Sequence, residues 1–214
     1  MNQAIREARD RFAATIQPAH DLITVHKRAN ANPGQRVEEL SLNRAAVVFA
    51  VAAWQTFVER LTSGLADGMA PAAGDPTQGV YRLLRANVAS QVERLNTPNS
   101  ANAKALLATV NFDPTPVWAF TLEWEKAWAL AHGSQMERAS LNAHQVREEL
   151  DSWLQVRHRL AHGDRLPTEK RYEQLVTGRR GNDRRLNRRD ANRCIAFFSK
   201  LVDATAREAE RQFP

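Results

Sequence analysis

The segment LNRAAVVFAVAAWQTFVERL, residues 42–61, contains the longest apolar run of the chain, from Ala45 to Trp54. Apolar residues cover most of the helical circumference up to Trp54, as in a helix buried on nearly every side. The run has only about half of the ~20 residues that a membrane-spanning helix needs. It therefore predicts the central helix of a soluble protein, from just after Ser41 to about Ala66.

The composition favours one α-helical domain over residues 1–214. Apolar residues make up 43% of the chain, which is enough for one substantial core. Only nine Gly and nine Pro interrupt it, which favours long helices over a turn-rich β fold. The single cysteine, Cys194, excludes an intrachain disulfide framework and indicates a reducing cytoplasm. We expect Cys194 to be an inert thiol in the core.

Turn and capping residues divide the rest of the chain into further helices. We expect them at about 3–29, 78–95, 100–111, 141–163 and 187–212, with a short helix within 166–176. The segment 112–131 predicts a loop followed by a helix. No pair of strands is indicated, so the predicted class is all-α.

A second segment, LQVRHRLAHGDRL (residues 154–166), departs from an ordinary amphipathic helix. At about 100° per residue, the apolar residues between Val146 and Ala161 share one face, and Arg157 falls near its middle. His158 and His162 fall on the flank of that face. Since arginine keeps its charge in proteins, a buried Arg157 needs an anion, either an acidic side chain or a bound ligand.

Three interpretations of this segment stay open. In the first, Arg157 forms a structural ion pair with a buried Asp or Glu, and the two histidines are surface residues. In the second, His158 and His162 bind a metal as an i, i+4 pair, with Asp164 as a weak third ligand and no HExxH pattern. In the third, the segment is a site for phosphodiester chemistry.

Cleavage of RNA by its own 2′-hydroxyl needs a base, an acid and positive charge on the phosphate. Histidine serves as acid or base near neutrality, and arginine binds phosphate oxygens with a planar fork. Arg157 and His162 diverge by about 140° on one helix, so a single copy is poorly arranged to close on one phosphate. Two copies across a two-fold axis supply each residue twice, which predicts a homodimer.

Arg157 and His162, with four residues between them, resemble the Arg-x4-His signature of HEPN domains. These form an all-α superfamily of nucleotide-binding domains and ribonucleases from prokaryotic toxin and defence systems. Residues 42–61 resemble the buried second helix of the RiboL-PSP branch. NTPNSANAKALLATVNFDP, residues 96–114, resembles the middle segment of that branch. The resemblance covers about residues 40–165, the expected core of the domain.

The resemblance implies an up-and-down bundle with a four- or five-helix core and extra helices. It also implies a homodimeric endoribonuclease that needs no metal or cofactor and leaves 2′,3′-cyclic phosphate and 5′-hydroxyl ends. Arg157 and His162 take the catalytic positions, and His158, where the family often has Asn or Asp, is expected to assist. Gln55 stands where an acid is usual, which makes Glu59 the nearest acid for orienting a basic group.

Such an enzyme implies a cytoplasmic toxin or phage-defence effector without membrane association, restrained by an antitoxin or a regulatory partner. The alternative function is a non-catalytic HEPN module that binds nucleic acid or a partner protein. In that case Arg157 is structural.

Arginines are also concentrated after the motif. The segment GRRGNDRRLNRRDANR, residues 178–193, holds seven Arg and leads into the last helix, and the net charge of +6 fits a polyanionic partner. We interpret the segment either as a phosphate-binding patch or as a solvated charged loop. In the first case the RNA-binding residues are Arg159, Arg165, Arg179, Arg180, Arg184 and Arg185.

Overall fold

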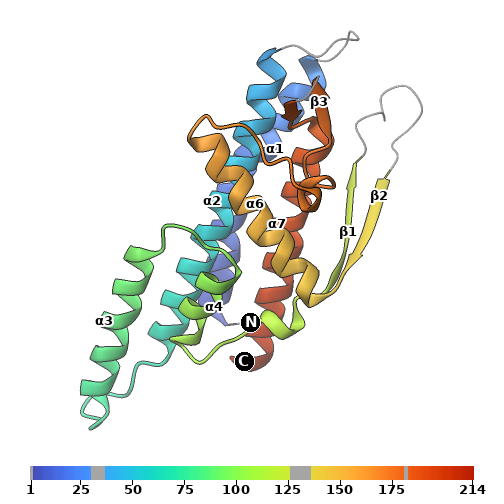
Figure 1. The fold of residues 1–214 in the computed structure, drawn as a ribbon. Helices are drawn as coiled ribbons and strands as arrows, with labels where there is room; N and C mark the ends of the chain where they lie inside the picture. The colour runs from blue at the N-terminus through green and yellow to red at the C-terminus, as the bar shows by residue number, and fades with distance from the viewer. Residues whose placement is uncertain (1, 30–36, 126–135, 181–182) are drawn as a thin grey trace.

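The computed structural model describes residues 2–29, 37–125, 136–180 and 183–214, and the chain is mostly helical over these ranges (Figure 1). The described part holds α1 (Gln3–Ala29), α2 (Val37–Gly68), α3 (Gln78–Arg94), α4 (Ser100–Ala108), α6 (Ala143–Ala161) and α7 (Arg188–Gln212). Short 3-10 turns lie at Thr115–Val117 and Lys170–Tyr172. The structure confirms the prediction that the chain is mainly helical.

The core forms where α1, α2 and α7 pack side by side along the long axis of the molecule (Figure 1). Trp54 of α2 lies at its centre, fully buried, with its ring 6.0 Å from that of Trp118 and 6.5 Å from that of Phe198. Its indole N–H donates to the carbonyl oxygen of Pro98 at 2.9 Å, so the buried donor is satisfied. The predicted central helix is confirmed, although Phe49 on its outer face is 40% exposed.

Helices α1 and α2 approach each other closely at Gly64. A Cβ atom at this position would lie 2.7 Å from the Cβ atom of Ala4, closer than packed side chains come. Glycine at 64 and alanine at 4 therefore let the two backbones approach, and this close contact fixes the position of α2 for the helices that pack on its other sides.

The structure contains strands that the sequence analysis did not predict. Strand β1 (Phe120–Glu125) pairs antiparallel with β2 (Met136–Leu141), and β3 (Gly178–Arg180) pairs with β4 (Asp183–Arg185). The helix expected within 112–131 is wrong in the described part, because 120–125 is extended. Its residues alternate inside and outside with period two, and Leu122 and Trp124 are buried.

The other expected elements agree with the structure to within a few residues, with one exception. The short helix expected within 166–176 is only the 3-10 turn at Lys170–Tyr172. Asn99 and Asn142 cap α4 and α6 through side-chain oxygens that accept backbone N–H groups. Among the described residues, no helix is long and apolar enough to cross a membrane.

Candidate functional site

The end of α6 is fixed by a glycine turn. Gly163 has φ of +71°, and its N–H donates to the carbonyl oxygen of Leu160 at 3.3 Å. The N–H of Asp164 donates to the carbonyl oxygen of Arg159 at 2.9 Å, which completes a Schellman motif. The helix expected at about 141–163 therefore ends where the sequence predicted, and His162 is its C-cap residue at an exposed corner of the chain.

Arg157 lies one turn before this corner and is half-buried. Within the described part of the chain, its guanidinium forms no hydrogen bond and no ion pair. Of the two acids nearest in sequence, Asp151 accepts hydrogen bonds from Ser100, and Asp164 pairs with Arg159 at 3.6 Å, on the surface. The acidic partner required by the structural interpretation of Arg157 is thus not found among the described residues, and its charge is available to a bound anion.

His158 and His162 are both exposed, and their rings lie against each other with centroids 4.4 Å apart and planes at 54°. They follow the i, i+4 spacing of one helical face. In the described ranges, no group of three His, Cys, Asp or Glu side chains is arranged to hold a metal ion. The two imidazoles therefore form a solvent-accessible pair without a third ligand there.

Glu59, the candidate orienting acid, lies at a different junction. Its carboxylate accepts a hydrogen bond from the amide nitrogen of Gln55 at 2.9 Å, and the same nitrogen donates to the carbonyl oxygen of Leu95. These contacts join α2 to the end of α3. No described contact connects Glu59 with Arg157, His158 or His162, so its expected orienting role receives no geometric support.

Two open cavities lie beside α6, the larger along the helix and the smaller at its C-terminal end. The larger, of about 730 Å³, is lined by His158 and by residues of both charges, among them Glu148, Lys170 and Arg171. The smaller, of about 360 Å³, is lined by Gly163, the residue immediately after His162, among others. His158 lines the larger cavity, and its ring contacts the ring of His162.

The smaller cavity collects arginines from three distant segments. Arg165, Arg184 and Arg185, all predicted to bind RNA, line it together with Arg44 of α2. Sequence reasoning missed Arg44, whose only signal is a lone charge at the start of an apolar run. Arg159 lies outside this lining, paired with Asp164. The backbones of Arg179 and Arg180 belong to β3, but their side chains lie outside the description.

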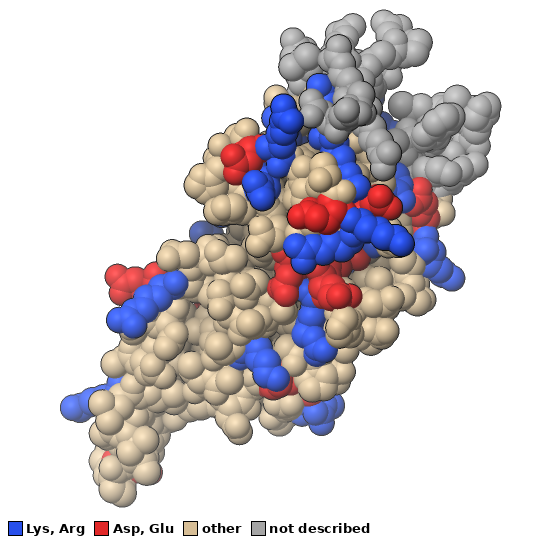
Figure 2. Space-filling model, in the orientation of Figure 1, with Lys and Arg blue, Asp and Glu red and all other residues tan. Residues whose placement is uncertain are grey.

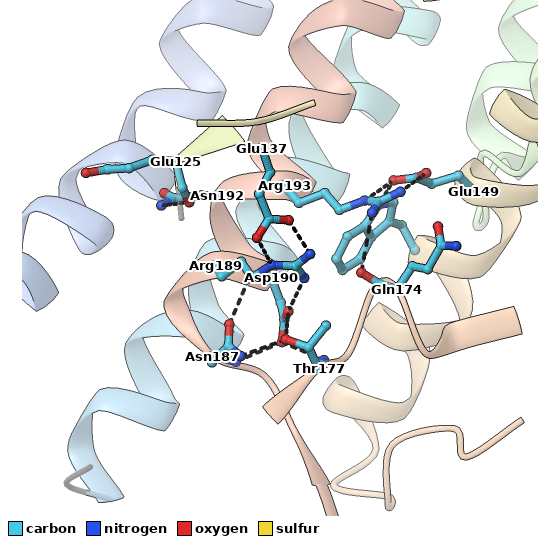
Figure 3. Close-up of polar contacts among 11 residues, drawn as sticks. Glu125, Glu137, Glu149, Gln174, Thr177, Asn187, Arg189, Asp190, Asn192 and Arg193 are labelled. Carbon is cyan, nitrogen blue, oxygen red and sulfur yellow. Dashed lines mark hydrogen bonds and ion pairs between the residues drawn. The ribbon is translucent and has the colours of Figure 1, made fainter. Parts of the chain in front are cut away.

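A buried charged cluster, which the sequence did not reveal, supports the other side of α6 (Figure 3). Arg193 of α7 donates to both carboxylate oxygens of Glu149, at 2.9 and 2.7 Å, and the two side chains are only 4% and 7% exposed. The guanidinium also lies 4.7 Å from the centre of the Trp124 ring. This ion pair joins α6 to α7 and closes the inner wall of the larger cavity.

Asp190 forms the second half of the buried cluster. Its carboxylate accepts hydrogen bonds from the backbone N–H and hydroxyl of Thr177 and from the backbone N–H of Asn187 (Figure 3). Burial raises the pKa of Asp190 to about 6, although these hydrogen bonds and the nearby charge of Arg189 oppose the rise. Part of the Arg-rich segment is therefore structural rather than a solvated loop, because Asp190 and Arg193 are buried.

The surface does not form a one-signed basic face in this orientation. Figure 2 shows Lys and Arg interspersed with Asp and Glu over the half of the molecule that holds the end of α6, whereas the α3 end is mostly uncharged. Positive charge is thus concentrated locally, in the arginine-lined cavity, rather than spread over this side of the molecule.

Searches against models of protein families, curated proteins and solved structures find no match for this chain.

Proposed function

We propose that this chain is a metal-independent endoribonuclease of HEPN type, with Arg157 and His162 as its catalytic residues. The observation that carries the proposal is the end of α6. A half-buried arginine, Arg157, has no anionic partner in the described chain and is followed by two exposed imidazoles in contact, those of His158 and His162. These are the groups that attack of a 2′-hydroxyl on its own phosphate requires.

Each residue has a defined part in this chemistry. Arg157 binds a non-bridging oxygen of the scissile phosphate and stabilises the charge that develops there. His162 acts as general acid or base, and His158, in contact with its ring, is a second imidazole at the same corner. The attacking 2′-oxygen displaces the 5′-oxygen, so one product ends in a 2′,3′-cyclic phosphate and the other in a 5′-hydroxyl.

A homodimer completes the proposed site. Arg157 and His162 project in directions about 140° apart around α6, so one protomer places its arginine and its histidine toward different neighbours. A two-fold axis beside the end of α6 would bring the arginine of one protomer to the histidine of its partner. An enzyme of this kind acts as a toxin or defence effector and requires an antitoxin or other regulatory partner.

The test compares purified wild type with His162→Ala and, as a matched control, His144→Ala. His144 is an exposed histidine near the start of the same helix, paired with Glu148. With a mixed RNA pool and a chelator, wild type and His144→Ala are expected to generate 2′,3′-cyclic phosphate ends. His162→Ala lacks the general acid or base, so its rate of RNA cleavage is expected to be about 10²- to 10⁴-fold lower than that of wild type.

Three outcomes would contradict the proposal or part of it. If the wild-type dimer cleaves no RNA in the pool while still binding it, the chain is better described as a non-catalytic nucleic-acid-binding module. If sedimentation shows a monomer at micromolar concentration and that monomer cleaves RNA, the composite site is wrong. Equal activity of His162→Ala and His144→Ala would move the chemistry away from the end of α6.

A further inference from the structure

The arginine-lined cavity beside His162 is built from segments far apart in the sequence. Arg44 comes from the first turns of α2, Arg165 from the turn after α6, and Arg184 and Arg185 from strand β4. The volume is about 360 Å³, larger than a single phosphate group needs and open to solvent on one side. Four guanidinium groups around one cavity repel one another, and a bound anion would offset this repulsion.

Described carboxylates compensate only part of this charge. Asp164 is the one acidic residue that lines the cavity, and Arg159 outside the cavity already pairs with it. No ion pair or hydrogen bond within the described residues holds Arg44, Arg165 or Arg185. The cavity therefore carries a local excess of positive charge that is not neutralised by the described side chains around it.

Arg184 shows that the cavity is a built site rather than a chance cluster of surface arginines. Its side chain is only 6% exposed. One guanidinium nitrogen, Nη2, donates to the carbonyl oxygen of Thr168 at 2.9 Å and lies 3.4 Å from Glu173. The other, Nη1, is buried and has no hydrogen-bond acceptor among the described residues. The cavity wall therefore contains a guanidinium that is held in place by protein acceptors and keeps one unsatisfied donor.

We propose that this cavity binds a phosphate group of an RNA strand, next to the scissile phosphate. Guanidinium groups match the oxygens of phosphate in geometry and charge. Gly163, the residue after His162, lines the cavity, so a strand that contacts His162 can place a neighbouring phosphate among the arginines. The assignment to RNA rests on the proposed function, whereas phosphate binding does not.

The first experiment measures binding without cleavage, using a fluorescent 2′-O-methyl RNA oligomer that lacks the attacking hydroxyl. The test variant is Arg44→Gln/Arg185→Gln, and the control is Arg82→Gln/Arg94→Gln, which removes two exposed charges from α3. We expect affinity to fall at least about 30-fold in the test variant. The slope of log K against log[salt] should also decrease by about 0.7, the value for one lost phosphate contact on a single strand. The control should change affinity less than about threefold.

Equal losses in the two double variants would overturn the proposal, because they would show only a general effect of net charge. A second arm identifies the source of the phosphate. If inorganic phosphate raises the melting temperature of wild type but not of Arg44→Gln/Arg185→Gln, while RNA affinity is the same in both, the cavity serves a free anion and the RNA assignment is wrong.

Cleavage assays separate this inference from the proposed function. If wild type cleaves RNA and the test variant does so with a raised KM and a nearly unchanged kcat, both stand. If wild type does not cleave but the test variant alone loses RNA binding, the ribonuclease proposal fails and the phosphate site stands. Unchanged KM and unchanged binding in the test variant would refute the site.

Discussion

Arg193 of α7 and Arg157 of α6 are both helical arginines, but their environments are opposite. Arg193 is buried, held by two hydrogen bonds to Glu149 and covered by the ring of Trp124. Arg157 is half-buried and has no acidic partner in the described chain. Because a buried charge costs free energy unless it is paired, the first arrangement identifies a structural arginine. The second arrangement leaves the charge of Arg157 available to bind an anionic ligand.

The strongest test of this contrast removes the anion from the structural arginine. Glu149→Gln leaves the charge of Arg193 buried without an anion, with neutral acceptors such as the carbonyl oxygen of Gln174 at 3.5 Å. We expect a loss of about 3–5 kcal/mol in the free energy of unfolding, measured with urea. Glu148→Gln, at the exposed neighbouring position, should cost less than about 1 kcal/mol. Similar losses in the two variants would show that the buried pair is not structural.

A smaller effect is expected from the pH dependence of Asp190. Burial raises its pKa from 3.8 to about 6 on folding, so the folded chain binds more protons than the unfolded chain between these values. Stability contributed by this group is therefore greatest below pH 4 and falls as pH rises, by about 3 kcal/mol in total by pH 7.

This prediction is measured as the difference in unfolding free energy between wild type and Asp190→Asn at several pH values. The amide introduced by this substitution does not titrate, so the difference should shift against wild type as pH rises from 4 to 7. Asp10→Asn, at an exposed position, should give a difference that is nearly independent of pH. A shift in favour of wild type over this interval would mean that hydrogen bonds from Thr177 and Asn187 outweigh burial.

The smallest effect on stability is expected at Arg157. Arg157→Gln removes a charge but leaves no described carboxylate without its partner, so the free energy of unfolding should change by less than about 1 kcal/mol. RNA cleavage, in contrast, should fall at least about 100-fold, because the phosphate loses its cation. A loss of stability comparable to that of Glu149→Gln would make Arg157 a structural residue and remove the contrast.

Much of the helical fold could be predicted because its signals are local. The apolar run ending at Trp54, the asparagine caps at Asn99 and Asn142, and the terminator Gly163 each act within a few residues. The strand at 120–125 was missed because its aromatic residues were interpreted with helical periodicity. Its alternation, with Leu122 and Trp124 inside, was a usable signal.

The candidate site could be predicted only in part. Arg157, His158 and His162 share one helix, so their relation follows from helical geometry. The arginine cavity depends on Arg44 approaching Arg184 from a distant part of the sequence, and no local pattern encodes such an approach. The pairing of Glu149 with Arg193 is likewise a consequence of how α6 packs against α7, which the sequence of either helix alone does not specify.

The burial of Cys194 gives the molecule an internal reporter of its own fluctuations. It is the only cysteine in the sequence, its side chain is fully buried one residue after Arg193, and burial together with the charge of Glu149 raises the pKa of its thiol. A thiol reagent can react only when this part of α7 opens. The labelling rate of the native protein therefore measures how often the helix interface separates, without denaturant and without an engineered cysteine.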